Sequence, residues 1–264
     1  MTVRFRWRAA SRGGDTVQVD EELLGGNVTA AVRVGDTVRR PVGPWSDAVD
    51  ALLEHLASVG FTGAPKPLGR DEQGRQVLEF VLGVVGTPSP SYSLSELREI
   101  GNLLRDLHIA TASFVPPASA TWNQVIAPDR EELVCHNDPA PWNLVRASDR
   151  WVFIDWDFAG PGSRLWDLAY NAQTSVPLHP PLDAAAVAPR LRALVDGYDL
   201  DGPSRSELAG MLARRARAMH EMLRRQASVG QEPWARIWIE DGRYWEETTQ
   251  YLVNNTAAWA DALL

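Results

Sequence analysis

The chain of 264 residues contains one cysteine, Cys135, and one lysine, Lys66. A single thiol excludes an internal disulfide and a zinc site built from cysteines. No apolar run approaches the roughly 20 residues that are needed to span a bilayer. The first eight residues alternate basic and apolar side chains and do not form the apolar core of a signal peptide. We therefore expect a cytoplasmic protein that does not enter a membrane.

Several common nucleotide and metal motifs are also missing. The chain has no G-x-x-x-x-G-K-[ST] phosphate loop, no G-x-G-x-x-G fingerprint after a strand, and no H-E-x-x-H pair among its five histidines. These absences argue against a P-loop NTPase, a dinucleotide-binding fold and a zinc hydrolase of that type. The formal net charge of −8 argues against nucleic acid as a partner. This charge is compatible with a cationic substrate, although acidic surfaces are also common for solubility alone.

The order of the predicted elements divides the chain into a strand-rich part and a helix-rich part. Residues 1–83 contain short runs typical of strands, separated by glycine-containing turns, with one helix expected from Ser46 to Ser58. Residues 84–93 are rich in Gly, Pro and Ser, which indicates a linker. Helical periodicity dominates the rest. We therefore predict an α+β chain of two lobes, residues 1–83 and 84–264, with a cleft between them.

Local signals define several elements more closely. Strands are expected over residues 28–34 and 37–40, joined by a turn at Gly35, and over residues 77–82. Two capping boxes, Ser93 with Glu96 and Ser204 with Glu207, predict helix starts. The three C-terminal helices are expected over residues 184–199, 204–229 and 233–264.

The most informative segment of the chain is residues 136–157. His136, Asp138 and Asn143 form the pattern H-x-D-x-x-x-x-N, and Asp155 follows a short apolar strand twelve residues after that Asn. Phosphoryl transfer needs a carboxylate near the attacking hydroxyl and oxygen ligands that hold Mg²⁺ on the phosphates. Asp138 is thus the candidate base, and Asn143 and Asp155 are the candidate metal ligands.

An ordinary structural explanation exists for the first pattern alone. Asp138 and Asn143 could be turn residues in a loop that contains Pro139 and Pro141. The second pattern favours catalysis, because a carboxylate at the end of an apolar strand is poorly placed for stability but well placed for a cleft. The two patterns together therefore predict a phosphoryl-transfer site.

This segment resembles the aminoglycoside phosphotransferase and choline kinase superfamily, small-molecule kinases with a protein-kinase-like fold. The family's loop is similar to H-G-D-x-x-x-x-N followed by I-D-W-E or I-D-W-D, which correspond here to 136–143 and 154–157. A later Asp-Leu-Ala signature corresponds to residues 167–169, and residues 103–108 are similar to an L-x-x-L-H helix. The resemblance covers about residues 23–170.

The resemblance implies particular roles. Asp138 would be the catalytic base, while Asn143 and Asp155 would hold Mg²⁺. Asp157 would assist the metal site or the substrate. His136 and Asp167 would hold the loops in place by hydrogen bonds.

The resemblance also implies a nucleotide site in the N-terminal lobe. Gly25, Gly26 and Asn27 resemble a shortened glycine loop whose backbone N–H groups would cover the phosphates. The hinge between the lobes would meet the adenine through backbone groups at Glu79 and Val81. ATP with Mg²⁺ is the implied cofactor pair, and GTP is open as an alternative donor.

One departure from such kinases concerns the cation on the third strand. A lysine usually holds the α- and β-phosphates there, paired with a glutamate on the next helix. Here Arg40, or Arg39 if the register differs by one, must replace the lysine. The following helix offers Asp47, Asp50 and, later, Glu54 in place of the glutamate.

We therefore predict a kinase that moves the γ-phosphoryl group of ATP to a hydroxyl of a small molecule, such as an aminoglycoside, amino alcohol or sugar. The alternative is a catalytically weak nucleotide-binding protein with a binding or scaffolding role. A protein acceptor is disfavoured, because Asp167 follows Asp157 by only ten residues, which leaves little room for a peptide-docking segment.

The C-terminal helices are expected to shape the acceptor pocket, and they are rich in aromatic residues. Trp234, Trp238 and Trp245 recur at roughly helical spacing, which favours core packing over a substrate wall. Acidic side chains lie between these aromatics, which would suit a cationic acceptor. A solvated acidic helix face is the other explanation. The acidic side chains are Glu240, Asp241, Glu246 and Glu247.

Overall fold

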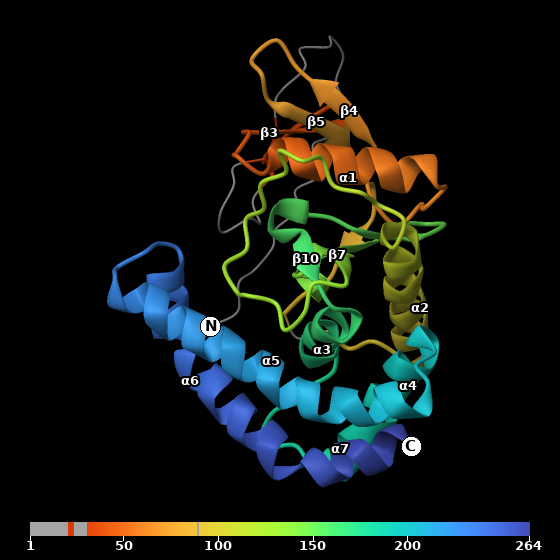
Figure 1. Cartoon of the computed structure of the whole chain (residues 1–264), viewed down its shortest axis with the longest axis vertical. Coiled ribbons are helices and arrows are strands. Elements are labelled where there is room, and N and C mark those ends of the chain that lie inside the picture. The colour runs from red at the N-terminus through yellow and green to blue at the C-terminus, as the bar shows by residue number, and fades with distance from the viewer. Residues whose placement is uncertain (1–20, 24–30, 89) are drawn as a thin grey trace, which may run out of the picture.

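The N-terminal part of the molecule is built on an antiparallel sheet (Figure 1). The computed structural model describes residues 21–23, 31–88 and 90–264. Within these residues five strands pair in the order β1-β2-β3-β5-β4. Gly35, with φ of +61°, forms the predicted turn between β2 and β3. The strand bounds are Glu21–Leu23 for β1, Ala31–Val34 for β2, Thr37–Arg40 for β3, Pro67–Arg70 for β4 and Gln76–Glu79 for β5.

Helix α1 (Ser46–Ser58) lies between β3 and β4 in sequence and has the predicted bounds. Its apolar residues recur at helical spacing and are buried, among them Val49, Leu52 and Leu56. The helix contacts β4 on one side and the C-terminal part on the other. It therefore connects the sheet to the rest of the molecule.

Two small sheets carry the loops of the C-terminal part. Strand β7 (Leu133–Cys135) pairs with β10 (Gly160–Gly162), and β6 (Val84–Val85), β8 (Leu144–Arg146) and β9 (Trp151–Phe153) form the second sheet. The segment expected to be a linker thus contains a strand, β6, that belongs to the C-terminal part.

Six helices complete the described structure and form the lower part of Figure 1. The predicted capping box at Ser93 is present at the start of α2. The helix bounds are Leu94–Thr111 for α2, Arg164–Ser175 for α3, Ala184–Tyr198 for α4, Gly202–Ser228 for α5, Trp234–Asn254 for α6 and Thr256–Leu263 for α7.

Three sequence predictions differ from the structure. The prediction that Ser204 caps a helix was wrong, because Asp201 caps α5 by accepting a hydrogen bond from Ser204 N at 2.8 Å. The single helix expected over residues 233–264 is two, α6 and α7, separated at Asn255. Strand β5 ends at Glu79 instead of residue 82, because its partner strand β3 begins at Thr37, which lies opposite Glu79.

One hydrophobic core runs through both parts of the molecule. It contains Leu52 of α1, Leu78 of β5, Leu104 of α2 and Phe153 of β9, all nearly inaccessible to solvent. The two lobes are therefore joined by packed side chains as well as by the chain itself. Among the described residues, no helix is both long enough and apolar enough to cross a membrane.

Helices α2 and α4 approach closely through two glycines. A Cβ on Gly101 would lie 2.1 Å from Leu194 O, and a Cβ on Gly197 would lie 2.1 Å from Arg98 O. Both obstacles are backbone atoms, which cannot rotate away. The close packing of these two helices therefore requires glycine at both positions.

We predict that Gly101→Ala lowers the free energy of unfolding by about 1–3 kcal/mol, because the added methyl group separates the two helices. Chemical denaturation followed by circular dichroism measures the change. Gly210→Ala in α5 is the matched control, since a Cβ there meets nothing within 4 Å. The control should be neutral or stabilising by about 0.5–1 kcal/mol. Equal stability of the two variants would contradict the proposed close contact.

Candidate active site

The catalytic loop, residues 136–143, follows β7 and ends in the 3₁₀ turn η1 (Pro141–Asn143). The turn folds Asn143 back onto Asp138. Asn143 Nδ2 donates to Asp138 Oδ2 at 2.7 Å and to the Asp138 backbone O at 3.1 Å. The two residues of the sequence pattern are thus in direct contact, which independent turn residues would not require.

The metal loop, residues 154–160, follows β9 and contains the 3₁₀ turn η2 (Trp156–Phe158). Ile154 N donates to Asn143 O at 2.8 Å, and a hydrogen bond of 3.1 Å joins His136 Nε2 to Ile154 O. Asp155 has φ of +60° and ψ of +68°, in the left-handed region that residues other than glycine rarely adopt. Such backbone strain is concentrated at functional sites, so this observation supports a role for Asp155.

The environment of Asp138 favours its protonated form. Burial and, after it, the negative charge of Asp155 raise the pKa of Asp138 to about 7. Hydrogen bonds from Tyr170 and Asn143 and the positive charge of Arg215 act in the opposite direction. A carboxyl group with a pKa in this range can take up a proton near neutral pH.

The donor set fits a hard divalent cation. The backbone oxygen of Asp138 can only accept a hydrogen bond, so the Asn143 amide must turn Nδ2 toward it, which leaves Oδ1 for a metal. The Asp155 side chain is 38% exposed, and the backbone N–H of the preceding Ile154 donates to Asn143 O. Carboxylate and amide oxygens are the ligands that Mg²⁺ prefers.

Of the two arginines considered in place of the lysine, Arg40 is the one that contacts the metal loop. Its guanidinium is buried and donates from Nη2 to Asp155 Oδ1 at 3.0 Å and to Asp157 Oδ2 at 2.5 Å. Trp45 Nε1 donates to the other oxygen of Asp157 at 3.1 Å. Arg40 thus lies beside the metal loop and is held there by two carboxylates.

The other candidates for this role bind elsewhere. Arg39, on the opposite face of β3, pairs with Asp71 at 3.2 Å. On helix α1, Asp47 and Asp50 both pair with Arg70 of β4, at 2.9 and 2.6 Å. No ion pair between Arg40 and α1 occurs in the described part of the chain, so the partner of the cation comes from the metal loop.

Asp167 of α3 binds the backbone of the catalytic loop. Its two oxygens accept hydrogen bonds from His136 N at 3.2 Å and Asn137 N at 2.9 Å. His108 Nε2 lies 3.0 Å from the same carboxylate, and Tyr198 hydroxyl bonds to the other ring nitrogen. Burial lowers the pKa of His136, which favours its neutral ring. These contacts join the catalytic loop to helices α2 and α3.

Sequence patterns did not identify three residues around Asp138 and the metal loop. Tyr170 hydrogen-bonds to Asp138, and the Arg215 guanidinium lies 4.1 Å above the Tyr170 ring. Trp45 binds Asp157. Arg215 and Trp45 lie on α5 and just before α1, far from the motif in sequence, so no local spacing could point to them. Tyr170 follows the Asp-Leu-Ala signature by one residue, which was a usable signal.

His108, Cys135 and Asp167 place one possible metal-binding atom each within 4.8 Å of one another, and all three are buried. Asp167 already accepts three hydrogen bonds, and Cys135 Sγ lies 3.5 Å from Ser163 O. Burial raises the pKa of the Cys135 thiol, which opposes the thiolate that a metal needs. This cluster is a hydrogen-bond network in the core.

The predicted nucleotide contacts are placed only in part. Gly25, Gly26 and Asn27 lie outside the described residues. Glu79 N donates to Lys66 O at 2.9 Å, so this N–H is not available to an adenine. Val81 makes no such backbone hydrogen bond within the described residues, which leaves its N–H and C=O as the groups that could contact a base.

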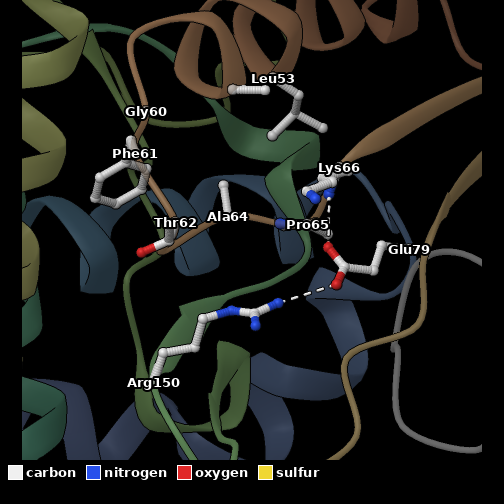
Figure 2. A pocket seen from close by; sticks show the side chains of 10 residues that line it. Leu53, Gly60, Phe61, Thr62, Ala64, Pro65, Lys66, Glu79 and Arg150 are labelled. Carbon is white, nitrogen blue, oxygen red and sulfur yellow. Dashed lines mark hydrogen bonds and ion pairs between the residues drawn. The ribbon is translucent and has the colours of Figure 1, made fainter.

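The Glu79 side chain faces a separate cavity of about 210 Å³ behind the hinge (Figure 2). Glu79 accepts hydrogen bonds from Arg150 Nη2 at 2.9 Å and from Lys66 N at 3.2 Å. The cavity has an apolar side formed by Leu53, Phe61 and Ala64. It contains none of the residues assigned to chemistry, so it is distinct from the site around Asp138.

In the C-terminal helices, aromatic and acidic residues differ in their exposure to solvent. Trp245 and Trp259 are buried, as core packing predicts. The aromatic cluster that contains Trp245 also includes Tyr170 and half-buried Trp142 of the catalytic loop. The four acidic residues of α6 are exposed, which is the solvated face considered above. They are Glu240, Asp241, Glu246 and Glu247.

Comparison with known proteins gives both a family and a fold. Residues 118–207 match the sequence model of the phosphotransferase enzyme family. The trifolitoxin immunity protein of Rhizobium leguminosarum bv. trifolii is 34% identical over 246 residues, which span 84% of this chain and 93% of that protein. These findings confirm the resemblance on which the expected roles were based.

Two solved structures show the same fold at low sequence identity. A choline/ethanolamine kinase family protein from Mesorhizobium loti matches with a TM-score of 0.62 at 16% identity, over 94% of this chain and 92% of that chain. An amicoumacin kinase, solved with AMP-PNP, Ca²⁺ and its ligand, matches with a TM-score of 0.65 at 12% identity, over 86% and 87% of the two chains. The two-lobed kinase-like fold predicted from the sequence is therefore confirmed.

We predict that Asp167→Ala lowers the free energy of unfolding by about 3–5 kcal/mol, because buried donors from the catalytic loop and α2 lose their acceptor. Urea denaturation measures the change. Asp106→Ala is the control, since Asp106 forms an exposed ion pair with Arg105. Its effect should stay below about 1 kcal/mol. A loss as small in Asp167→Ala as in the control would show that the loop does not depend on this carboxylate.

Proposed function

We propose that this chain, which belongs to the phosphotransferase enzyme family, transfers the γ-phosphoryl group of ATP to a hydroxyl group of a small molecule. The observation that carries the proposal is the contact of the catalytic loop with the metal loop. Asn143 binds Asp138 through its side chain and binds the residue before Asp155 through its backbone. A base and two oxygen ligands for a metal are thus held in one place.

The residues have defined tasks in this reaction. Asp138 accepts the proton of the acceptor hydroxyl as its oxygen bonds to the γ-phosphorus, and the bond from that phosphorus to the bridging oxygen breaks to release ADP. Arg40 binds phosphate oxygens and stabilises the charge on the leaving group. Mg²⁺, held by Asn143 and Asp155, would neutralise charge on the phosphates. GTP is an alternative donor, and a cytoplasmic location is part of the same proposal.

A nucleotide-binding protein with little turnover is the competing explanation, because the usual lysine and helix glutamate are absent. Two contacts favour an active enzyme. Arg40 reaches the metal loop, and Asp157 with Trp45 orients it in place of the helix carboxylate. The cation is therefore present and held by hydrogen bonds, which is the function that the usual ion pair serves.

The similarity to a trifolitoxin immunity protein suggests a second candidate role, protection against a toxin. Protection could result from phosphorylation of a hydroxyl on the toxin or from binding alone. The exposed position of the acidic residues of α6 gives no support to a strongly cationic acceptor. The aromatic cluster beside Asp138 favours an acceptor with an apolar part.

We predict that ATP or ADP with Mg²⁺ raises the melting temperature by several degrees at saturating concentration, because ligands that bind the native state stabilise it. Arg40→Ala should weaken this binding by about 10–100-fold, since a hydrogen bond to a charged group contributes about 1.5–3 kcal/mol. Thermal shift and calorimetry measure both effects.

Arg39→Ala is the matched control for this experiment. Arg39 is adjacent in sequence but pairs with Asp71 on the other face of β3. Its nucleotide affinity should stay within about twofold of the wild type. If the two variants bind nucleotide equally well, Arg40 is not the phosphate ligand, and if the wild type binds no nucleotide at all, the proposed function is wrong.

We predict that Asp138→Asn reduces phosphoryl transfer by at least about 100-fold while MgATP binding changes little, because the amide cannot accept the proton. Release of ADP in the presence of candidate alcohols measures transfer. The same variant tests the toxin role: protection of sensitive cells would disappear if it depends on transfer and persist if it depends on binding. Full activity of Asp138→Asn would remove Asp138 from the mechanism.

A further inference from the structure

Asn137 stands at the position where the loop of the family has glycine. Its φ is +63°, and the other non-glycine residues with positive φ in the described part of the chain are Asp155 and Asp199. Glycine adopts this conformation without cost, and asparagine is among the few other residues that tolerate it. The backbone therefore explains why either residue fits, but it does not explain what the asparagine side chain does.

The side-chain amide of Asn137 reaches across to the metal loop. Nδ2 donates to Phe158 O at 3.1 Å and to Gly160 O at 3.2 Å. A Cβ added to Gly162 would lie 3.1 Å from Asn137 Oδ1, so the following backbone packs closely against the same amide. Glycine at position 137 would make none of these side-chain contacts.

The backbone of Asn137 is held by two helices. Its N–H donates to Asp167 Oδ1 of α3 at 2.9 Å. Its carbonyl oxygen accepts from Arg215 Nη2 of α5 at 3.5 Å, and Arg215 is a buried cation stacked on Tyr170. The backbone of Asn137 is therefore bound to the helical part of the molecule, while its side chain binds the metal loop. Asn137 thus links the two.

We propose that Asn137 is a positioning residue, whose amide sets the place of the metal loop relative to Asp138 and thereby orients Asp155. This role rests on the proposed function. Phe158 and Gly160 follow Asp155 by three and five residues, within one short turn and strand. A shift of these two carbonyl groups would therefore move the carboxylate that is to hold Mg²⁺, although Asn137 itself touches neither the metal nor the phosphates.

The test compares Asn137→Gly and Asn137→Asp with the wild type. Glycine keeps the backbone conformation and removes the amide, while aspartate keeps the shape and places a carboxylate against two carbonyl oxygens. Asp199→Gly is the matched control, because Asp199 also has positive φ, at +65°, but is exposed at the end of α4. The control therefore reports the effect of a new glycine alone.

The main readout is the ratio of the ADP dissociation constants without and with Mg²⁺. We expect Asn137→Gly to lower this ratio by about threefold to tenfold, the effect of one or two lost hydrogen bonds, with Asn137→Asp lower still. Metal-free ADP binding should stay within about twofold in every variant, because the phosphate-binding Arg40 is untouched. Asp199→Gly should change neither constant.

A wild-type ratio in both Asn137 variants would overturn the proposal. So would an equal loss of metal-free and Mg²⁺-dependent binding, since that result indicates general unfolding of the loop. A wild-type protein that binds no nucleotide overturns the proposed function and the role in transfer with it. Hydrogen exchange of residues 156–162 then decides the structural part alone: exchange faster in Asn137→Gly than in Asp199→Gly shows that the amide holds the metal loop.

Discussion

The buried carboxylate of Asp167 is the constraint on which the site depends. A carboxylate without access to water is stable only if hydrogen-bond donors surround it. Asp167 obtains these donors from the backbone of His136 and Asn137 and lies against His108 of α2. Because the donors come from different segments, the carboxylate holds α2, α3 and the catalytic loop together. The loop is thus fixed from the helical core before any ligand binds.

The catalytic and metal loops form one unit. Backbone hydrogen bonds join Ile154 to Asn143, and the side chains of His136 and Asn137 reach carbonyl groups of the metal loop. Burial and, after it, repulsion by the negative charge of Asp155 raise the pKa of Asp138 in this unit. Arg215, buried beside Tyr170, opposes that repulsion from the side of α5.

Arg40 connects this unit to the N-terminal sheet in an altered way. In the usual kinase arrangement, the cation on the third strand pairs with a glutamate on the next helix. Here its partners are Asp155 and Asp157, while Asp47 and Asp50 of α1 pair with Arg70. Arg40, the proposed phosphate ligand, and Asp155, the proposed metal ligand, are therefore in contact.

The sequence alone determined the features that depend on local spacing. The contact of Asp138 with Asn143 follows from a five-residue interval closed by a short turn, and helix α1 follows from its apolar period and the residues that end it. Asp155 could be placed because an acidic residue ends an apolar strand. The order of strands and helices was sufficient to predict the two-lobed fold. These features involve residues that are near one another along the chain.

Only the tertiary structure decided the features that join distant segments. It placed Arg40 against the metal loop and Arg39 against Asp71, because the two side chains leave opposite faces of β3. It brought Trp45 to Asp157 across 112 positions and Arg215 to Asn137 across 78. No periodicity or motif records such contacts, since they arise when helices and sheet pack around a common core. The physical reason is that packing geometry and the pairing of buried charges determine which side chains are in contact. Both act between segments that are far apart in the sequence.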